Sequence, residues 1–260
     1  MGSPGTFGLS VQKAQKVRDL MVGPSGAAEA ETQVPTEVPQ SARARRFFAG
    51  ILSDRQWGGL LSGQEWRAAA GLLTGLVAAA RVNASQQRLE QWVERQGFMG
   101  ETALIRLGSE LLERLDADLP ERDVIGFELA SYALRRTVDE LYATDRSPFD
   151  VDRELLLQRL PKIDTEKALV TYIGSYLQEL VRYITGGLPA ATDAEEKLRS
   201  SFLSSVQKDE VPKLARDFLA TLRQYSERKY GSGRPLAEML DDVPEWLADA
   251  AKELFKGDAK

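Results

Sequence analysis

Apolar side chains at helical spacing recur along most of this 260-residue chain, and they constrain its fold more than any other feature. The clearest stretch is 165–185, where apolar positions follow the i, i+3, i+4, i+7 pattern of one helix face. The stripe consists of Leu169, Tyr172, Ile173, Tyr176, Leu177, Leu180, Val181 and Ile184. Gly186-Gly187 and then Pro189 predict the end of this helix.

The same spacing predicts further helices between Ser41 and Phe255. Their expected ranges are 42–52, 63–81, 85–96, 101–117, 121–143, 150–160, 192–206, 209–229 and 243–256. Prolines lie at or near most of the breaks, and we find neither a convincing period-2 strand series nor an Asn-Gly hairpin signal. We therefore predict an all-α protein, with one helical bundle-like domain over 41–260 and a flexible N-terminal tail over 1–40.

The tail divides into a short helix and a linker. Residues 22–40 hold three prolines, three glutamates and no aromatic residue, which predicts a disordered linker. Ahead of it, a helix is expected over 10–21. Its apolar stripe consists of Val11, Ala14, Val17, Leu20 and Met21. Because so short a helix is marginal alone, we expect it to dock on the body, on a second copy or on a partner.

Histidine and cysteine are both absent from the sequence. Their absence excludes Ser-His-Asp and Cys-His catalytic units, and also zinc, haem and iron–sulfur sites of the usual kind. Proton transfer would require a carboxylate, Lys or Tyr with a strongly shifted pKa. We therefore expect no catalysis and no cofactor, and a carboxylate-based enzyme is the least favoured alternative.

The acidic series Asp150, Asp152 and Glu154 is similar to a calcium loop, but Leu155 stands where an EF-hand has its glycine. Carboxylates at a helix N-terminus complement the helix dipole without any metal, which also accounts for the acidic pair at 241–242. We therefore expect no metal site. The glycines form neither a GxxxxGK[ST] loop nor a strand-linked GxGxxG, so no standard phosphate loop is expected.

One segment combines arginines with aromatic residues, namely Arg43, Arg45 and Arg46 followed by Phe47 and Phe48. The arginines and Phe48 could hold phosphate and stack a base, as in a nucleic-acid-binding subunit. The alternative is the solvated start of a helix whose Phe47 faces the core, since three charges give only modest phosphate affinity. The net charge of −5 argues against nucleic-acid binding by the whole surface. Residues that could extend a basic patch are Arg135, Arg136, Arg223, Arg228 and Lys229.

The most apolar run, 68–80, is shorter than the roughly 20 residues of a membrane span. The N-terminus has no basic region followed by a long apolar stretch, so we expect no signal peptide and no membrane association. The absence of cysteine fits a reducing compartment, and a cytoplasmic protein is expected. Loss of Met1 would expose Gly2 as a site for modification, unless Gly2-Ser3 is a remnant of cloning.

The layout of the chain resembles QatB, the helical component of four-part bacterial anti-phage Qat operons. The resemblance is carried by the start Met1–Gly5, the arginine-rich 42–46, the Gly/Ala-rich 70–73 and the helix 170–186 that ends in glycine. It implies a non-enzymatic protein whose Gly2 is acted on by a companion similar to a deazaguanine synthase. We therefore predict a helical interaction subunit of an intracellular bacterial defence complex that binds one or more protein partners, with a second copy of the chain as one candidate. The alternative is a nucleic-acid-binding subunit that uses the 43–48 segment.

Overall fold

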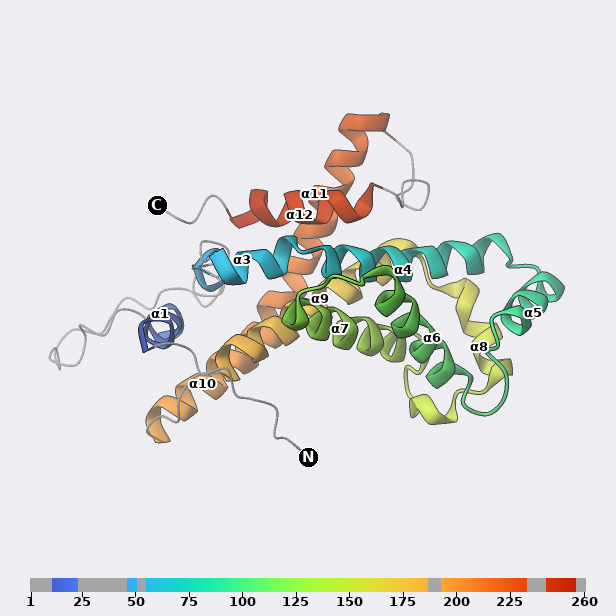
Figure 1. Cartoon of the computed structure of the whole chain (residues 1–260), viewed down its shortest axis with the longest axis horizontal. Coiled ribbons are helices and arrows are strands. Elements are labelled where there is room, and N and C mark those ends of the chain that lie inside the picture. The colour runs from blue at the N-terminus through green and yellow to red at the C-terminus, as the bar shows by residue number, and fades with distance from the viewer. Residues whose placement is uncertain (1–10, 23–45, 51–54, 187–192, 233–241, 256–260) are drawn as a thin grey trace, which may run out of the picture.

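The computed structural model describes residues 11–22, 46–50, 55–186, 193–232 and 242–255 (Figure 1). Every regular element in these ranges is a helix, and none of the described residues forms a strand, which confirms the predicted all-α class. The linker 22–40 lies outside the described residues except at Val22, and so do Gly2, Arg43 and Arg45.

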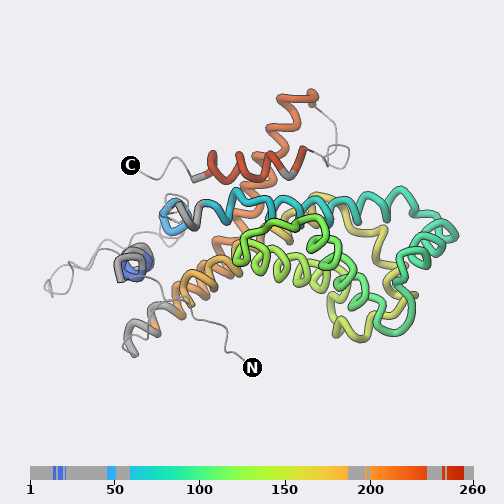
Figure 2. Tube along the Cα trace, viewed as in Figure 1, coloured from blue at the N-terminus to red at the C-terminus, as the bar shows by residue number. Residues whose placement is uncertain are grey.

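The helices carry the labels of Figure 1, and a further helical segment at 46–50 lies between the first two of them. The elements are α1 (Val11–Val22), α3 (Arg55–Ser62), α4 (Gln64–Val82), α5 (Gln86–Arg95), α6 (Ala103–Asp118), α7 (Val124–Tyr142), η2 (Pro148–Asp150), α8 (Arg153–Arg159), η3 (Leu160–Lys162), α9 (Thr165–Gly186), α10 (Asp193–Ser205), η4 (Val206–Glu210), α11 (Val211–Tyr230) and α12 (Val243–Phe255). Figure 2 shows the chain running out along α4 to α5 and returning through α6 to α7.

Helix α9 forms the centre of the body, because it packs against α7, α11 and α4. Every side chain of the apolar stripe predicted for it is buried. Two tyrosines of the stripe also bond to neighbouring backbone: the Tyr172 hydroxyl donates to the Trp66 carbonyl at 3.0 Å, and the Tyr176 hydroxyl donates to the Leu60 carbonyl at 2.7 Å. These bonds satisfy the polar ends of two buried rings and tie α9 to α3 and α4.

The helix layout differs from the sequence prediction in several places. The break expected between 206 and 209 is absent, because α10 continues through the π-helical segment η4 into α11. Pro212 has no N–H to donate to the preceding turn, and a wider π turn accommodates that missing bond without ending the helix. Helix α3 was not predicted, since Gly58-Gly59 gives its segment low helix propensity. Its packing against α12 and α4 stabilises it, with Leu60 and Leu61 buried.

The expected helix at 150–160 is divided into the short turn η2, the helix α8 and the turn η3. Asp152 is the N-cap of α8, and its Oδ1 accepts a hydrogen bond from the Leu155 N–H at 2.9 Å. This carboxylate therefore satisfies the start of a helix, which is the role that the sequence favoured over a calcium ligand.

Helix α1 packs against α10. Three side chains of its predicted stripe, those of Ala14, Val17 and Met21, are buried, and Val17 has no exposed surface. The side chains of Val11 and Leu20 lie outside the described residues. The buried side chains belong to the same hydrophobic core as the helical body. That a partner or a second copy binds α1 stays a prediction, and so does the domain boundary at residue 41.

Candidate functional site

An open groove of about 360 Å³ lies where the last turns of α11 meet α12. Its lining consists of Tyr225, Arg228, Lys229, Trp246 and Asp249. The first three share one face of α11 because they are spaced i, i+3 and i+4, and the last two are spaced i and i+3 on α12. Figure 1 shows α12 crossing α11, and the C-terminal end of α11 projecting beyond it. The groove is therefore held by two helices that are fixed in the body.

Three aromatic rings cluster at this groove. The Trp246 ring centroid lies 6.4 Å from that of Tyr225 and 6.4 Å from that of Tyr230, with interplanar angles of 61° and 57°. Such tilted and edge-on contacts are favourable between aromatic rings. Trp246 is half-buried, whereas Tyr230 is 39% exposed. The cluster therefore offers apolar ring surface at the edge of the body.

Two cations lie over these rings. The Lys229 ammonium is 5.2 Å from the Tyr230 centroid and 6.0 Å from that of Trp246. The Arg228 guanidinium carbon is 5.8 Å from the Tyr225 centroid. Ring faces attract cations at such distances through their quadrupole.

Carboxylates neutralise part of this charge. Asp242 accepts from the Lys229 ammonium at 2.9 Å and also from the Tyr230 hydroxyl. The hydrogen bond from Tyr230 and the one from Lys229 lower the pKa of Asp242, and the bond to Asp242 raises the pKa of Lys229. Both groups are therefore charged at neutral pH. Asp249 pairs with Lys252 at 3.3 Å.

Arg228 is the lining cation that forms no ion pair with any of the described residues. Among the described lining residues, one positive charge therefore lacks an ion-pair partner beside the aromatic rings, and the Glu253 carboxylate lies behind Tyr225.

The Tyr225 hydroxyl donates to Glu253 Oε2 at 2.6 Å. Desolvation, followed by this hydrogen bond, raises the pKa of Tyr225 to about 12. The hydroxyl thus remains protonated at neutral pH and acts as a donor. Its bond to Glu253 fixes the ring that forms one wall of the groove.

Other polar groups serve the helix ends. Glu65 is 4% exposed, and its Oε1 accepts a hydrogen bond from the Asp123 N–H at 2.8 Å. The Asp123 side chain in turn accepts from the Gly126 N–H at 2.6 Å and caps α7. These two carboxylates satisfy N–H groups that a helix start leaves without partners.

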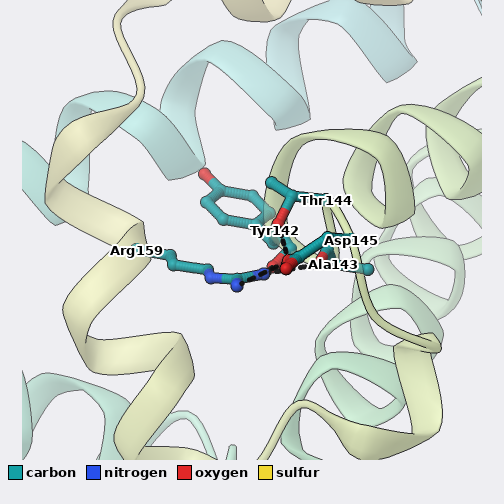
Figure 3. A network of polar contacts seen from close by, with 5 residues as sticks. All are labelled: Tyr142, Ala143, Thr144, Asp145 and Arg159. Atoms are coloured by element: carbon teal, nitrogen blue, oxygen red, sulfur yellow. Dashed lines mark hydrogen bonds and ion pairs between the residues drawn. The ribbon is translucent and has the colours of Figure 1, made fainter.

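Figure 3 shows the opposite end of α7, where Arg159 closes the helix. Its guanidinium donates to the carbonyls of Tyr142 and Ala143, both at 2.5 Å, and pairs with Asp145 at 3.4 Å. Thr144 has a φ of 57° and donates its hydroxyl to Asp145 at 2.8 Å. A residue in the left-handed region is typical just after a helix end. This cluster is therefore a cap.

Replacing Arg159 with methionine should lower the free energy of unfolding by about 1–3 kcal/mol, because two buried carbonyls lose their donor. Chemical denaturation at neutral pH measures the change. Asp145→Asn is the control, and its effect should be smaller because Asp145 is exposed. An equal effect of the two substitutions would show that the ion pair, and not the cap, stabilises this end.

The same two variants should differ in their pH dependence. The hydrogen bond from Thr144 is the main cause that lowers the pKa of Asp145 in the folded state. A lowered folded-state pKa contributes stability above the ordinary pKa, and this contribution is lost as pH falls through the folded value. The stability of Asp145→Asn should therefore match that of the wild type in strong acid. Arg159→Met should be less stable than the wild type both at neutral pH and in strong acid. Denaturation at neutral and acidic pH tests this.

The 43–48 segment, predicted to contact nucleic acid, is described from Arg46 onward. Arg46 is exposed. Phe47 and Phe48 have no exposed surface, and the Phe47 centroid lies 5.4 Å from that of Phe202 on α10. In this conformation the Phe48 ring could therefore stack no base, and both phenylalanines contribute to the core.

Two of the other basic residues that could extend this segment are paired with carboxylates. Arg135 pairs with Asp139 on its own helix at 3.5 Å, and Arg223 Nε donates to Glu166 Oε1 on α9 at 2.9 Å. Their charges are thus compensated locally, and Arg228 of the same predicted set lies instead in the groove.

Sequence reasoning missed the aromatic cluster at the groove, in which Tyr225 and Trp246 line the groove and Tyr230 packs on Trp246. A signal was present, because Tyr225 shares a helix face with Arg228, and Trp246 lies in the first turn of the next helix. Within the described ranges, no group of acidic side chains could hold a metal ion, and no helix is both long and apolar enough to cross a membrane. Comparison of the chain with protein-family models, curated proteins and solved structures finds no match.

Proposed function

We propose that this chain is a helical interaction subunit, without catalysis of its own, that binds a protein partner through the groove between α11 and α12. The observation that carries the proposal is the three-ring cluster around Trp246, with the exposed Arg228 beside it. Trp, Tyr and Arg are the residues that most often dominate protein–protein binding energy. Partly exposed rings with a polar rim are also typical of interface centres.

The resemblance of the layout to QatB supports a place for this subunit in an intracellular bacterial defence complex. In that setting the protein works in the cytoplasm, and Gly2 is presented to a companion enzyme. The burial of Ala14, Val17 and Met21 supports a docking role for α1, with the body as its first docking surface. A nucleic-acid-binding role has less support, since the buried Phe48 leaves Arg46 as the one exposed group of the described 46–48 stretch.

Partner binding should depend on the groove aromatics. The tagged wild type, expressed in its native host cells, should co-purify with a partner protein. The Trp246→Ala and Tyr230→Ala variants should each retain at least about tenfold less of that protein. The control is Phe149→Ala, which removes a ring that is 65% exposed on η2, outside the groove. Thermal melts of all variants check that the body stays folded, which is expected because Leu247 and Ala251 anchor α12.

The proposal fails if the partner is retained equally by the two groove variants. It also fails if Phe149→Ala alone reduces retention. Co-purification of nucleic acid in place of protein, lost on replacement of Arg46, would instead favour the nucleic-acid alternative.

A further inference from the structure

The distribution of charge in the groove favours binding of an anion. Lys229 is paired with Asp242 and Asp249 with Lys252, so among the described lining residues the unpaired charge is that of Arg228. Its exposed guanidinium can present several N–H donors in a fork that matches a carboxylate. Charge complementarity therefore favours a partner group with one negative charge at this point of the groove.

The surface next to Arg228 is apolar. Trp246 and Tyr225 form its walls, and the Tyr225 hydroxyl is already bonded to Glu253. The ring faces thus offer contact area and not further hydrogen bonds, which suits an aliphatic or aromatic side chain of the partner. An anionic group followed by an apolar side chain would match both parts of the groove.

The surrounding carboxylates argue against a polyanion. Asp242, Asp249 and Glu253 all lie in or beside the groove, and Arg228 is its one uncompensated cation among the described residues. A nucleic-acid strand carries a phosphate at every nucleotide, so it needs several cations along its path and would be repelled here. A peptide can instead place a single carboxylate opposite Arg228 and keep the neighbouring positions apolar.

From these contacts we infer that the groove binds an acidic peptide segment of the partner protein, with a carboxylate on Arg228 and an apolar side chain against Trp246 and Tyr225. This inference rests on the proposed interaction function. It adds the chemical class of the partner segment, which aromatic rings alone do not define.

Fluorescence anisotropy with three labelled probes and the full chain tests the inference. The first probe is a short peptide with a single Glu followed by Leu among uncharged residues, the second has Gln in place of that Glu, and the third is a deoxythymidine oligonucleotide of equal length. The Glu peptide should bind about tenfold more tightly than the Gln peptide, because a charge-assisted hydrogen bond contributes about that factor. The oligonucleotide should bind more weakly than the Glu peptide.

Two arginine variants provide a matched comparison. Arg228→Gln should reduce affinity for the Glu peptide to that for the Gln peptide, and leave the Gln peptide unaffected. Arg223→Gln removes the same charge from the same helix, but from a side chain that is paired with Glu166, so it should leave both peptides unaffected. This pair separates a contact with Arg228 from a general effect of net charge.

The inference is wrong if the Gln peptide binds as tightly as the Glu peptide, if the two arginine variants weaken binding equally, or if no peptide binds up to about 1 mM. Tighter binding of the oligonucleotide that is lost in Arg228→Gln would assign the groove to nucleic acid. If, in the co-purification experiment, Trp246→Ala no longer retains the partner but Arg228→Gln still does, the acidic segment is refuted and the proposed interaction function stands. Retention by both variants would refute the proposed function itself.

Discussion

Replacement of Trp66 with alanine is expected to lower the free energy of unfolding by about 3–5 kcal/mol. The Trp66 side chain is fully buried, its ring stacks on Tyr176 at 5.2 Å, and it meets Phe218 edge-on at 5.8 Å. The Trp66 ring therefore joins α4 to the central helix α9 and to α11. Alanine would leave a large cavity at that junction, which the surrounding helices can close only in part.

Urea denaturation followed by circular dichroism measures this loss. The matched control is Trp92→Ala, since Trp92 is half-buried on α5 and its nearest ring, that of Phe98, is 6.1 Å away. Its effect should be clearly smaller, because less apolar surface is lost and the site is open to solvent. Equal losses for the two substitutions would show that the junction at Trp66 is not the centre of the core.

Replacement of Val17 with aspartate is expected to release α1 from the body. Val17 has no exposed surface, and an unpaired carboxylate in its place would cost several kcal/mol. Because α1 is a short helix with few buried side chains, undocking should cost less than burying that charge. The body should stay folded, since the stripe of α9 and the Trp66 cluster remain intact.

Limited proteolysis and hydrogen exchange of residues 11–22 measure the docking of α1, and a thermal melt reports on the body. Gln15→Asp is the control, because it places the same charge on an exposed position of α1 and should leave α1 protected. Cooperative unfolding of the body in Val17→Asp would mean that the body does not stay folded without α1 and that the boundary predicted at residue 41 is wrong. Unchanged protection would show that α1 does not depend on this contact.

The helices that the sequence predicted best are those whose own periodicity defines a face. The stripe of α9 is buried along its whole length, because side chains at i, i+3, i+4 and i+7 share one side of any helix. The absence of histidine and cysteine likewise excluded whole classes of chemistry without any structure. Residue type and local spacing are enough for both conclusions.

Other features depend on contacts between distant segments. The segment of α3 has poor helix propensity and becomes helical because α12 and α4 pack against it. The π segment η4 replaces a predicted break, since the surrounding contacts keep α10 and α11 in one continuous run. Phe47 and Phe48 are consecutive and lie about 100° apart around a helix, so burying both requires a wide apolar face or contacts on two sides. Both are buried.

The sequence by itself determined that this chain is helical, where most of its helices lie, and that histidine and cysteine chemistry is excluded, since these properties depend on residue type and on neighbours within two helical turns. The groove was decided only by the tertiary structure. Trp246 meets Tyr225 and Tyr230 because α12 crosses the end of α11. Arg228 has no ion-pair partner in the part of the chain that the structure describes, where Lys229 pairs with Asp242 and Lys252 with Asp249. The crossing of the helices and the Lys229–Asp242 pair depend on three-dimensional packing, whereas the Asp249–Lys252 pair follows from i, i+3 spacing on one helix.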